Sequence, residues 1–487
     1  MSVLADRLKH LLDSGYPDQT LVRVELPVGR VNLLEWLSAQ VPLNRSLWAD
    51  REGDLEIAGL GCTWQYQLHN RSDITPCFEA VNSLLEIIPK ANSARCLGYL
   101  SFSDSASAVW PQYGYGKFFL PTLEIAQTRK GSVLACNLFA SDSESWMSGI
   151  RAALEIIEGI RWEGAFGSGA LALHSMTFRP DEDNWHALIN KATTDFRAGD
   201  MEKVVLSREA CLSYSGQLDP WHLLQQWRMS NPRSFLYAFE SDSGSQEPEV
   251  FLGCSPERLF SRQGRLIRTE ALAGTAARGR DRDEDFQMEL RLLNDSKNLH
   301  ENRLVLDDIR ERLSPLCDSL ESDRSHSVIK LKTVQHLRFL FRGILKKEVD
   351  DSELLSCLHP TPAVGGSSRE KALEFIEANE PYSRGLYSGA CGYIGRDNSE
   401  LSVSLRCGLL QENTLSLFSG AGIVKGSEAE DEWQELDNKI LTVLGLLKER
   451  ENHPGDNSNE HAAGRPSNPM SIIKSREVSD EFSHQAS

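Results

Sequence analysis

The stretch LSLFSGAGIVKGSEAEDEWQELDNKI, residues 415–440, predicts a strand, a glycine-rich turn and a helix that begins near Asp431. Within this helix Glu432, Glu435 and Lys439 lie at i, i+3 and i+7, so they share one face. Two carboxylates near a helix start are suited to a hard cation such as Mg²⁺. A solvated acidic first turn that complements the helix dipole fits the same spacing, and spacing alone favours it. The apolar face of the helix comprises Trp433, Leu436, Ile440 and Leu447.

Upstream of this stretch, strands and helices mix along the whole chain. Asp183 precedes a predicted helix that Gly199 ends. The strand KVVLSRE starts at Lys203, and further helices are predicted over about 295–313 and 146–159. No glycine-rich nucleotide fingerprint occurs. We expect an α+β fold in one large domain over residues 1–450, with sheets around a central core and flanking helices, followed by a disordered tail over 451–487.

Composition limits the function. The 487 residues carry a formal charge of −18, which disfavours nucleic acid and anionic membranes as partners. The N-terminus lacks the features of a signal peptide, and no apolar run is long enough to span a bilayer. Ten scattered Cys without a CxxC pair are typical of reduced core residues. The sequence therefore predicts a cytoplasmic protein.

Three further side chains are candidates for chemistry, each with a plainer alternative. Glu301 can join the metal site, or form an i, i+4 ion pair with Lys297. Glu257 follows the apolar run VFLGC, so a partly buried carboxyl there is suited to a general acid, or simply stabilises a turn. Lys203 can act as a base if it is desolvated, or blunt a strand edge.

Small residues and one arginine complete the candidate set. Gly274, Gly420 and Gly422 would let a ligand approach backbone N–H groups closely. Arg406 follows the strand-like LSVSL and can bind a carboxylate through two N–H groups. Each signal is weak by itself, because glycines in ordinary turns and arginines on the surface give the same sequence pattern as ligand-binding ones.

Taken together, these segments resemble the chorismate-utilising enzyme family. The resemblance is ordered along residues 203–440, whereas residues 1–170 match less specifically, although KFFLPTLEIA also looks like this family. Within the family the chain is most similar to isochorismate synthases, particularly those of menaquinone pathways. The matching motifs are KVVLSRE, GCSPERLF, TEALAGT, SKNLHEN, LHPTPAVGG, EPYSRGLYSGACGYI, LSVSLRCG and SGAGIVKGSEAEDEWQELDNKI.

The resemblance implies a fold like that of anthranilate synthase component I, and a role for each matching position. Lys203 matches the base that activates water, and Glu257 matches the general acid. Glu301 and Glu435 match the carboxylates that hold Mg²⁺, with Glu432 as an auxiliary carboxylate. The positions that match substrate contacts are Gly274, Thr275, Tyr387, Arg406, Gly420, Gly422 and Lys439, and His359 and Thr361 lie in a nearby pocket segment.

Two positions separate this chain from other members of the family. Ala273 stands where the covalent aminodeoxychorismate synthases carry a lysine, and Lys203 is present where anthranilate synthases lack it. One motif departs from the family pattern. Leu299 and Asn302 replace an arginine and a histidine around Glu301, which puts in question the residues that support the metal ligand, and not the ligand itself.

The resemblance thus implies a Mg²⁺-dependent isomerase that converts chorismate to isochorismate. Its expected partner is the small-molecule substrate alone, with no nucleic acid and no membrane, in a monomer or weak homodimer. The alternatives are salicylate synthase, an isochorismate synthase of a siderophore pathway, and a binding protein that keeps the fold without turnover.

Overall fold

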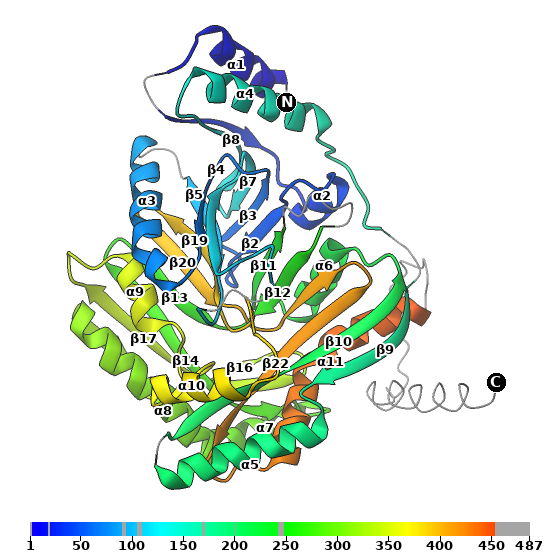
Figure 1. The fold of residues 1–487 in the computed structure, drawn as a ribbon, viewed down its shortest axis with the longest axis vertical. Helices are drawn as coiled ribbons and strands as arrows, with labels where there is room; N and C mark the ends of the chain where they lie inside the picture. The colour runs from blue at the N-terminus through cyan, green and yellow to red at the C-terminus, as the bar shows by residue number, and fades with distance from the viewer. Residues whose placement is uncertain are drawn as a thin grey trace.

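Two large antiparallel sheets form the body of the protein (Figure 1). The computed structural model describes residues 2–17, 20–89, 94–104, 110–167, 171–199, 201–241 and 248–452. Apart from its first two residues, the tail expected over 451–487 lies outside the described residues. The mixture of helices and sheets agrees with the expected α+β class.

The first sheet has twelve strands among the described residues. In the order of the sheet they are β1 (Leu21–Val28), β8 (Gly131–Phe139), β7 (Leu123–Thr128), β3 (Leu55–Leu60), β2 (Ser46–Ala49), β11 (Phe235–Glu240), β12 (Val250–Ser255), β21 (Cys407–Gln411), β22 (Thr414–Val424), β10 (Lys203–Gly216) and β18 (Gly366–Ser367), with β9 (Leu171–Arg179) also paired to β10.

The second sheet has ten strands in the described part of the chain. Their order is β15 (Cys317–Ser322), β17 (Val334–Leu345), β14 (Leu266–Ala277), β13 (Arg258–Gln263), β20 (Asn398–Val403), β19 (Ala390–Gly395), β5 (Arg95–Leu100), β6 (Gly116–Leu120) and β4 (Trp64–Leu68), with β16 (Ser327–Lys330) paired to β17.

Helices cover the two sheets and gather at both ends of the molecule (Figure 1). They are α1 (Ser2–Asp13), α2 (Leu33–Ala39), α3 (Ile74–Ile87), α4 (Ser143–Gly159), α5 (Glu182–Ala198), α6 (Pro220–Ser230), α7 (Arg282–Asn294), α8 (Ser296–Leu313), α9 (Asp351–Leu358), α10 (Arg369–Asn379) and α11 (Ala429–Asn452). Two short 3₁₀ turns, η1 (Arg71–Asp73) and η2 (Ser314–Leu316), complete the set. In Figure 1 α1 and α4 lie at the top, whereas α5, α7 and α8 lie at the bottom.

Local sequence signals explain several helix boundaries. The Asp181 side chain accepts a hydrogen bond from the Asn184 N–H and so caps α5, which starts two residues earlier than expected. Gly199 ends α5 with a φ of 82°, a left-handed conformation that favours glycine. Asp295 caps α8 in the same way, because its side chain accepts the Asn298 N–H.

The two halves of the chain share both sheets. Strand β2 of the N-terminal half pairs with β11, so that Trp48 lies opposite Tyr237. Strand β5 pairs with β19 of the second half, where Leu97 lies opposite Tyr393. Residues 1–170 are therefore part of the framework that positions the motif-bearing segments.

An aromatic layer lies between the sheets. Trp48 of the first sheet packs edge-on against Tyr393 of the second, with ring centroids 4.9 Å apart. Tyr99 packs against Phe239 across the same layer at 5.0 Å. All four side chains are buried, and burying an aromatic side chain contributes about 1.5–3 kcal/mol. This layer fixes how the sheets lie on each other, and hence where their strand ends meet.

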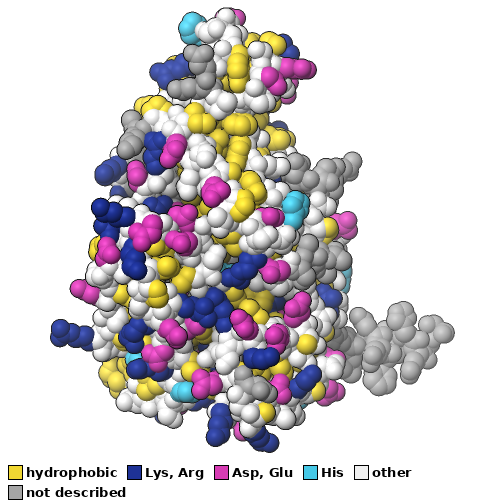
Figure 2. All heavy atoms as spheres, turned by 60° about the vertical axis from the view of Figure 1, so that its left-hand side comes forward, with side chains coloured by type: hydrophobic (Ala, Val, Ile, Leu, Met, Phe, Trp, Pro, Cys, Tyr) yellow, Lys and Arg dark blue, Asp and Glu magenta, His cyan; other side chains and the backbone are white. Residues whose placement is uncertain are grey.

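The surface carries acidic, basic and apolar side chains without separation on the face that Figure 2 shows. No helix of the described residues is long and apolar enough to cross a membrane. All ten cysteines lie in the described part of the chain as free thiols, and seven of them are buried, as expected for reduced core residues.

Candidate active site

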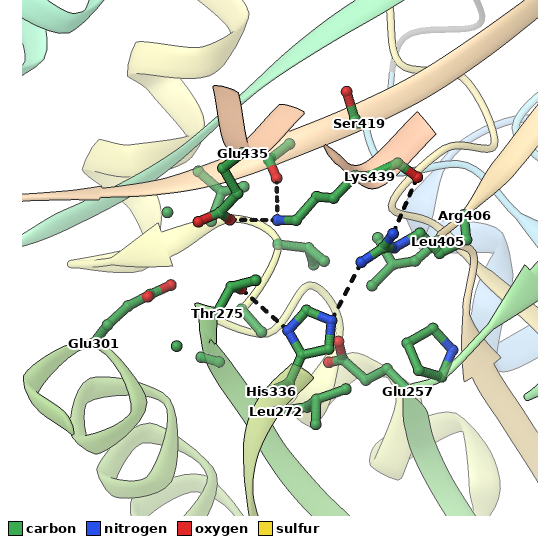
Figure 3. A pocket seen from close by; sticks show the side chains of 18 of the residues that line it. Glu257, Leu272, Thr275, Glu301, His336, Leu405, Arg406, Ser419, Glu435 and Lys439 are labelled. Carbon is green, nitrogen blue, oxygen red and sulfur yellow. Dashed lines mark hydrogen bonds and ion pairs between the residues drawn. The ribbon is translucent and has the colours of Figure 1, made fainter. Parts of the chain in front are cut away.

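One cavity collects most of the predicted site residues (Figure 3). Its walls come from β10 and β22 of the first sheet, β14 and β17 of the second, and helices α8 and α11. Ten of the twelve predicted residues line it: Glu257, Gly274, Thr275, Glu301, Tyr387, Arg406, Gly420, Gly422, Glu435 and Lys439. Lys203 and Glu432 lie directly behind the lining, each in contact with a carboxylate or lysine of this region.

Lys203 is fully buried at the first residue of β10, and its Nζ lies 3.0 Å from Glu301 Oε1. Strand β10 is paired on both sides there, with Val424 on β22 and Ser367 on β18. An edge lysine that blunts strand pairing is therefore excluded. The ion pair also excludes the simple Lys297–Glu301 helix pair, because Lys297 contacts Glu432 instead, at 2.6 Å.

Glu257 lies between β12 and β13 and is 2% exposed. Burial, and next the negative charge of Glu270, raise the pKa of Glu257 to about 8. The Lys203, Arg51 and Lys439 charges oppose this shift without cancelling it. Glu257 thus keeps its proton at neutral pH, as a general acid must.

The pKa values of two carboxyl groups on α11, Glu435 and Glu432, are shifted in opposite directions. Although burial opposes its charge, the Lys439 ammonium lowers the pKa of Glu435, and the two side chains lie 2.6 Å apart. Burial and then the Glu435 charge raise the pKa of Glu432, which is 3% exposed. A solvated acidic first turn is therefore wrong for these two residues, because Glu432 is buried and Glu435 lines the cavity.

Arg406 lies on the side of the cavity opposite Glu301, and His336 connects Arg406 to Thr275 (Figure 3). His336 Nε2 is 3.3 Å from Arg406 Nη2, and its Nδ1 is 3.1 Å from Thr275 Oγ1. Burial and then the Arg406 charge hold the pKa of His336 well below its usual range, so the imidazole is neutral. Because a guanidinium only donates, Nε2 accepts and Nδ1 donates to Thr275. The Thr275 hydroxyl proton is then free to point toward a ligand.

The sequence reasoning missed His336. It lies in the strand TVQHLRFLF, where a single histidine within an apolar run gives no spacing signal. Only the pairing of β14 with β17, which places Thr275 opposite His336, brings it into the site.

Helix α8 fixes the turn at Gly274 and Thr275. The Asn298 side chain accepts the Thr275 N–H at 2.8 Å, and Gly274 has a φ of 81°. Asn302, which replaces the histidine of the family motif, donates to the carbonyls of Ala273 and Leu337. This amide ties α8, the helix that carries Glu301, to both β14 and β17.

Tyr387 forms the aromatic wall of the cavity. Its ring stacks on Phe418 at 5.5 Å, and a Cβ at Gly420 would approach its hydroxyl to 2.5 Å. His359 and Thr361 do not line the cavity that the described residues form. His359 is buried and contacts the Ser388 carbonyl instead, so it supports the segment before Gly389.

A second group of possible metal ligands lies on the surface. Glu182, His186 and Glu430 place one ligand atom each within 4.8 Å of one another, at the contact of α5 with α11. Two of the three side chains are exposed, and exposed acidic groups are common without an ion. The predicted ligands Glu301 and Glu435 belong to the cavity and not to this surface group.

A methyl group at Gly422 is expected to disable the cavity without unfolding the protein. In Gly422→Ala the Cβ would lie 2.1 Å from Glu301 Oε1, so the flexible carboxylate must move away from Lys203. We expect kcat/KM to fall about 100-fold, with little change in the thermal midpoint. Gly445→Ala in helix α11 is the control, because a Cβ at Gly445 would have nothing within 4 Å. Unchanged turnover in Gly422→Ala would contradict the placement of this wall.

Comparison with known proteins shows the family to which the chain belongs. Residues 7–448 match the family described as "Chorismate binding enzyme". The chain belongs to this family, as the ordered motifs indicated.

Particular relatives narrow the comparison. The chain is 32% identical over 425 residues to isochorismate synthase MenF of Bacillus subtilis strain 168, which covers 83% of this chain and 88% of that protein. The solved structure of MenF, the menaquinone-specific isochorismate synthase from Escherichia coli, is similar with a TM-score of 0.79 and 31% identity, covering 91% of this chain and 99% of that one. Anthranilate synthase component I from Streptococcus pneumoniae shares the fold, with a TM-score of 0.64 and 20% identity, over 80% of this chain and 92% of that one.

Proposed function

We propose that the protein is an isochorismate synthase, an isomerase that adds water at C2 of chorismate while the C4 hydroxyl departs. The observation that carries this proposal is a buried carboxyl that lines the cavity together with a buried amine directly behind its wall, in contact with Glu301. Glu257 is a buried carboxyl with a pKa of about 8, and Lys203 is a buried amine on the first residue of β10. One group can supply a proton while the other removes one.

Glu257 is the proposed proton donor. Its carboxyl lines the cavity and comes from the short link, residues 256–257, that joins β12 to β13. A protonated carboxyl there can donate to the departing C4 hydroxyl and convert it into water. The surrounding apolar wall, which includes Leu272 and Leu405, keeps bulk water from this proton.

Lys203 is the proposed base for the attacking water. Its Nζ has no well-oriented hydrogen-bond acceptor among the described residues, although Glu301 lies 3.0 Å away. To act as the base, Lys203 first passes its proton to the neighbouring Glu301 carboxylate, and the neutral amine then accepts a proton from a water held between itself and the substrate ring. The Glu301 side chain also orients the amine.

The substrate carboxylates are proposed to bind at the polar walls. Arg406 and Lys439 supply positive charge, and the Thr275 hydroxyl supplies a donor. Gly274, Gly420 and Gly422 leave backbone atoms bare, so an anion can approach them closely. Tyr387 provides a flat wall for the ring.

Mg²⁺ fits the donor set that faces this cavity. Glu301 and Glu435 offer carboxylate oxygens, the ligand type that Mg²⁺ prefers, and Glu432 lies one helical turn away. When bound, Mg²⁺ would neutralise and orient a substrate carboxylate. Each of the three carboxylates contacts a lysine, so this wall already balances concentrated negative charge with positive side chains.

Removal of divalent cations is expected to abolish turnover reversibly. Without the ion, no cation would join the Glu301 and Glu435 oxygens to a substrate carboxylate. We expect EDTA-treated protein to regain activity on addition of Mg²⁺, and Glu435→Gln to bind Mg²⁺ at least 10-fold more weakly by calorimetry. Glu430→Gln, in the surface group, serves as control and should bind as the unsubstituted protein does. Weaker Mg²⁺ binding by Glu430→Gln, with unchanged binding by Glu435→Gln, would place the ion at Glu182, His186 and Glu430.

We further propose that the product enters menaquinone synthesis in the cytoplasm. The extensive similarity to two proteins named MenF supports the pathway, and ten free thiols support the compartment. The proposed partner is chorismate alone, bound by a monomer or weak homodimer.

Product analysis tests the proposal. Purified protein is incubated with chorismate and Mg²⁺, and the products are separated by chromatography. Isochorismate as the end product is the expected result. Salicylate with pyruvate would show a salicylate synthase instead, and calorimetric binding of chorismate without any product would show a binding protein.

A further inference from the structure

A buried ion pair lies behind Glu257, and nothing in the proposed chemistry uses it. Arg51 comes from the turn between β2 and β3, and Glu270 from β14. Arg51 Nη1 and Nη2 contact Glu270 Oε1 and Oε2 at 2.5 and 2.7 Å. The two side chains are 6% and 0% exposed.

The same pair holds the backbone on both sides of Glu257. Arg51 Nη1 donates to the carbonyl oxygen of Pro256 at 2.6 Å, and Glu270 Oε1 accepts the Arg258 N–H at 3.0 Å. These two peptide groups directly flank the proposed acid. The pair is therefore a two-point clamp on residues 256–258.

We propose that Arg51 and Glu270 are positioning residues that hold the Glu257 carboxyl in its donating orientation and set its charge state. This inference rests on the proposed function, because it takes Glu257 to be the proton donor. It brings a residue of the N-terminal half into the reaction.

Stability alone does not explain the clamp. Desolvating two charges costs several kcal/mol each, so a buried pair is often no more stable than an apolar replacement. Here the pair is also placed where its charges act on Glu257. The charges that act most on Glu257 are Glu270, which raises its pKa, and Lys203, Arg51 and Lys439, which lower it; Glu301, Arg406 and Glu435 line the same cavity.

Opposite substitutions therefore predict opposite shifts in the pH profile. Glu270→Gln removes a negative charge and leaves Arg51 with Glu52, 3.2 Å away, as its remaining charged partner, so the loss of kcat at high pH should begin about one pH unit lower. Arg51→Met removes a positive charge and leaves Glu270 unpaired, so this loss should begin at higher pH. Both variants should lose about 10- to 100-fold in kcat with a smaller change in KM, because the clamp is broken.

Two further variants separate positioning from folding. Arg51→Lys keeps the charge but cannot hold both Glu270 and Pro256 through a planar fork, so kcat should fall while the pH profile stays in place. Arg45→Met breaks another buried pair, with Glu240 at 2.5 Å, whose residues do not line the cavity. It should lower the thermal midpoint and leave both kcat and the pH profile unchanged.

One result would overturn the clamp. If Glu270→Gln, Arg51→Met and Arg45→Met all lose stability and all keep the pH profile of the unsubstituted protein, the Arg51–Glu270 pair has only a structural role. The titration of Glu257 is also read without turnover, from the infrared band of its protonated carboxyl, which is assigned by its loss in Glu257→Gln. If the protein makes no isochorismate, the proposed function fails, but opposite shifts of this band in Glu270→Gln and Arg51→Met would still support the clamp. If either variant does not fold, Arg51→Lys provides the test. An unshifted infrared band of Glu257 with reduced kcat would support the clamp, and an unreduced kcat would refute it.

Discussion

Glu257→Gln is expected to lower kcat about 1,000-fold while the protein folds normally. The amide has the shape of the carboxyl but cannot give up a proton to a departing hydroxyl. KM should change much less, because the walls that bind the substrate carboxylates are untouched. The unsubstituted enzyme should itself lose activity as the pH rises through about 8, where Glu257 loses its proton.

The same substitution is expected to stabilise the protein at neutral pH. The pKa of Glu257 rises from an ordinary 4.5 to about 8 on folding, so the folded chain holds a proton that the unfolded chain releases above pH 4.5. This cost grows as the pH rises from about 4.5 to 8, and at pH 7 it is on the order of 3 kcal/mol. Glu257→Gln avoids it, so its thermal midpoint should exceed that of the unsubstituted protein at pH 7 and match it near pH 4.

A buried carboxylate away from the cavity provides the control. Glu124 on β7 is 1% exposed and pairs with Arg23 at 2.6 Å. Glu124→Gln should reduce stability, because Arg23 loses the more deeply buried of its two charged partners and keeps only Glu25, and it should leave kcat unchanged. If Glu257→Gln retained most of the activity, the proton would have to come from another group, and the proposed mechanism would be wrong.

Segments with local signals were predictable from the sequence. Helix α5 is bounded by a capping aspartate and a left-handed glycine, and α11 carries its apolar residues at helical spacing. Such signals act within a few residues, so they are legible in one chain. The resemblance to a family then supplied the assignment of Lys203, Glu257 and Glu301 that spacing alone did not favour.

Contacts between distant segments were not predictable in the same way. Arg51 and Glu270 are 219 positions apart, and only the neighbouring order of β2, β11 and β12 in the first sheet brings the β2–β3 turn to the loop that carries Glu257. His336 meets Thr275 only through the register of β14 and β17. Register depends on the whole sheet, so no local pattern indicates these contacts.

The lysine partners of the carboxylates were partly misread for the same reason. Sequence spacing offered Lys297 as the partner of Glu301, four residues away on α8. The structure pairs Glu301 with Lys203 from the first sheet and Lys297 with Glu432 from α11. Helical spacing says which side chains can meet on one helix, but tertiary packing supplied closer partners.

Lys203→Ala is expected to reduce kcat about 1,000-fold or more, because it removes the proposed base. It also leaves the Glu301 carboxylate without its partner at 3.0 Å, so some stability is lost as well. Loss of activity in this variant alone would not tell the base from the ion pair. Product formation and the thermal midpoint must therefore be measured together, in this variant and in a second one.

Lys203→Arg separates the two roles. A guanidinium keeps the positive charge and can pair with Glu301, but it does not give up its proton in proteins, so it cannot serve as a base. We expect the thermal midpoint of Lys203→Arg to lie above that of Lys203→Ala while kcat remains as low. Small primary amines should restore part of the activity of Lys203→Ala and none of that of Lys203→Arg, because only the alanine variant leaves space for them. Turnover by Lys203→Arg near that of the unsubstituted protein would show that the charge of residue 203, and not proton removal, is what the reaction requires.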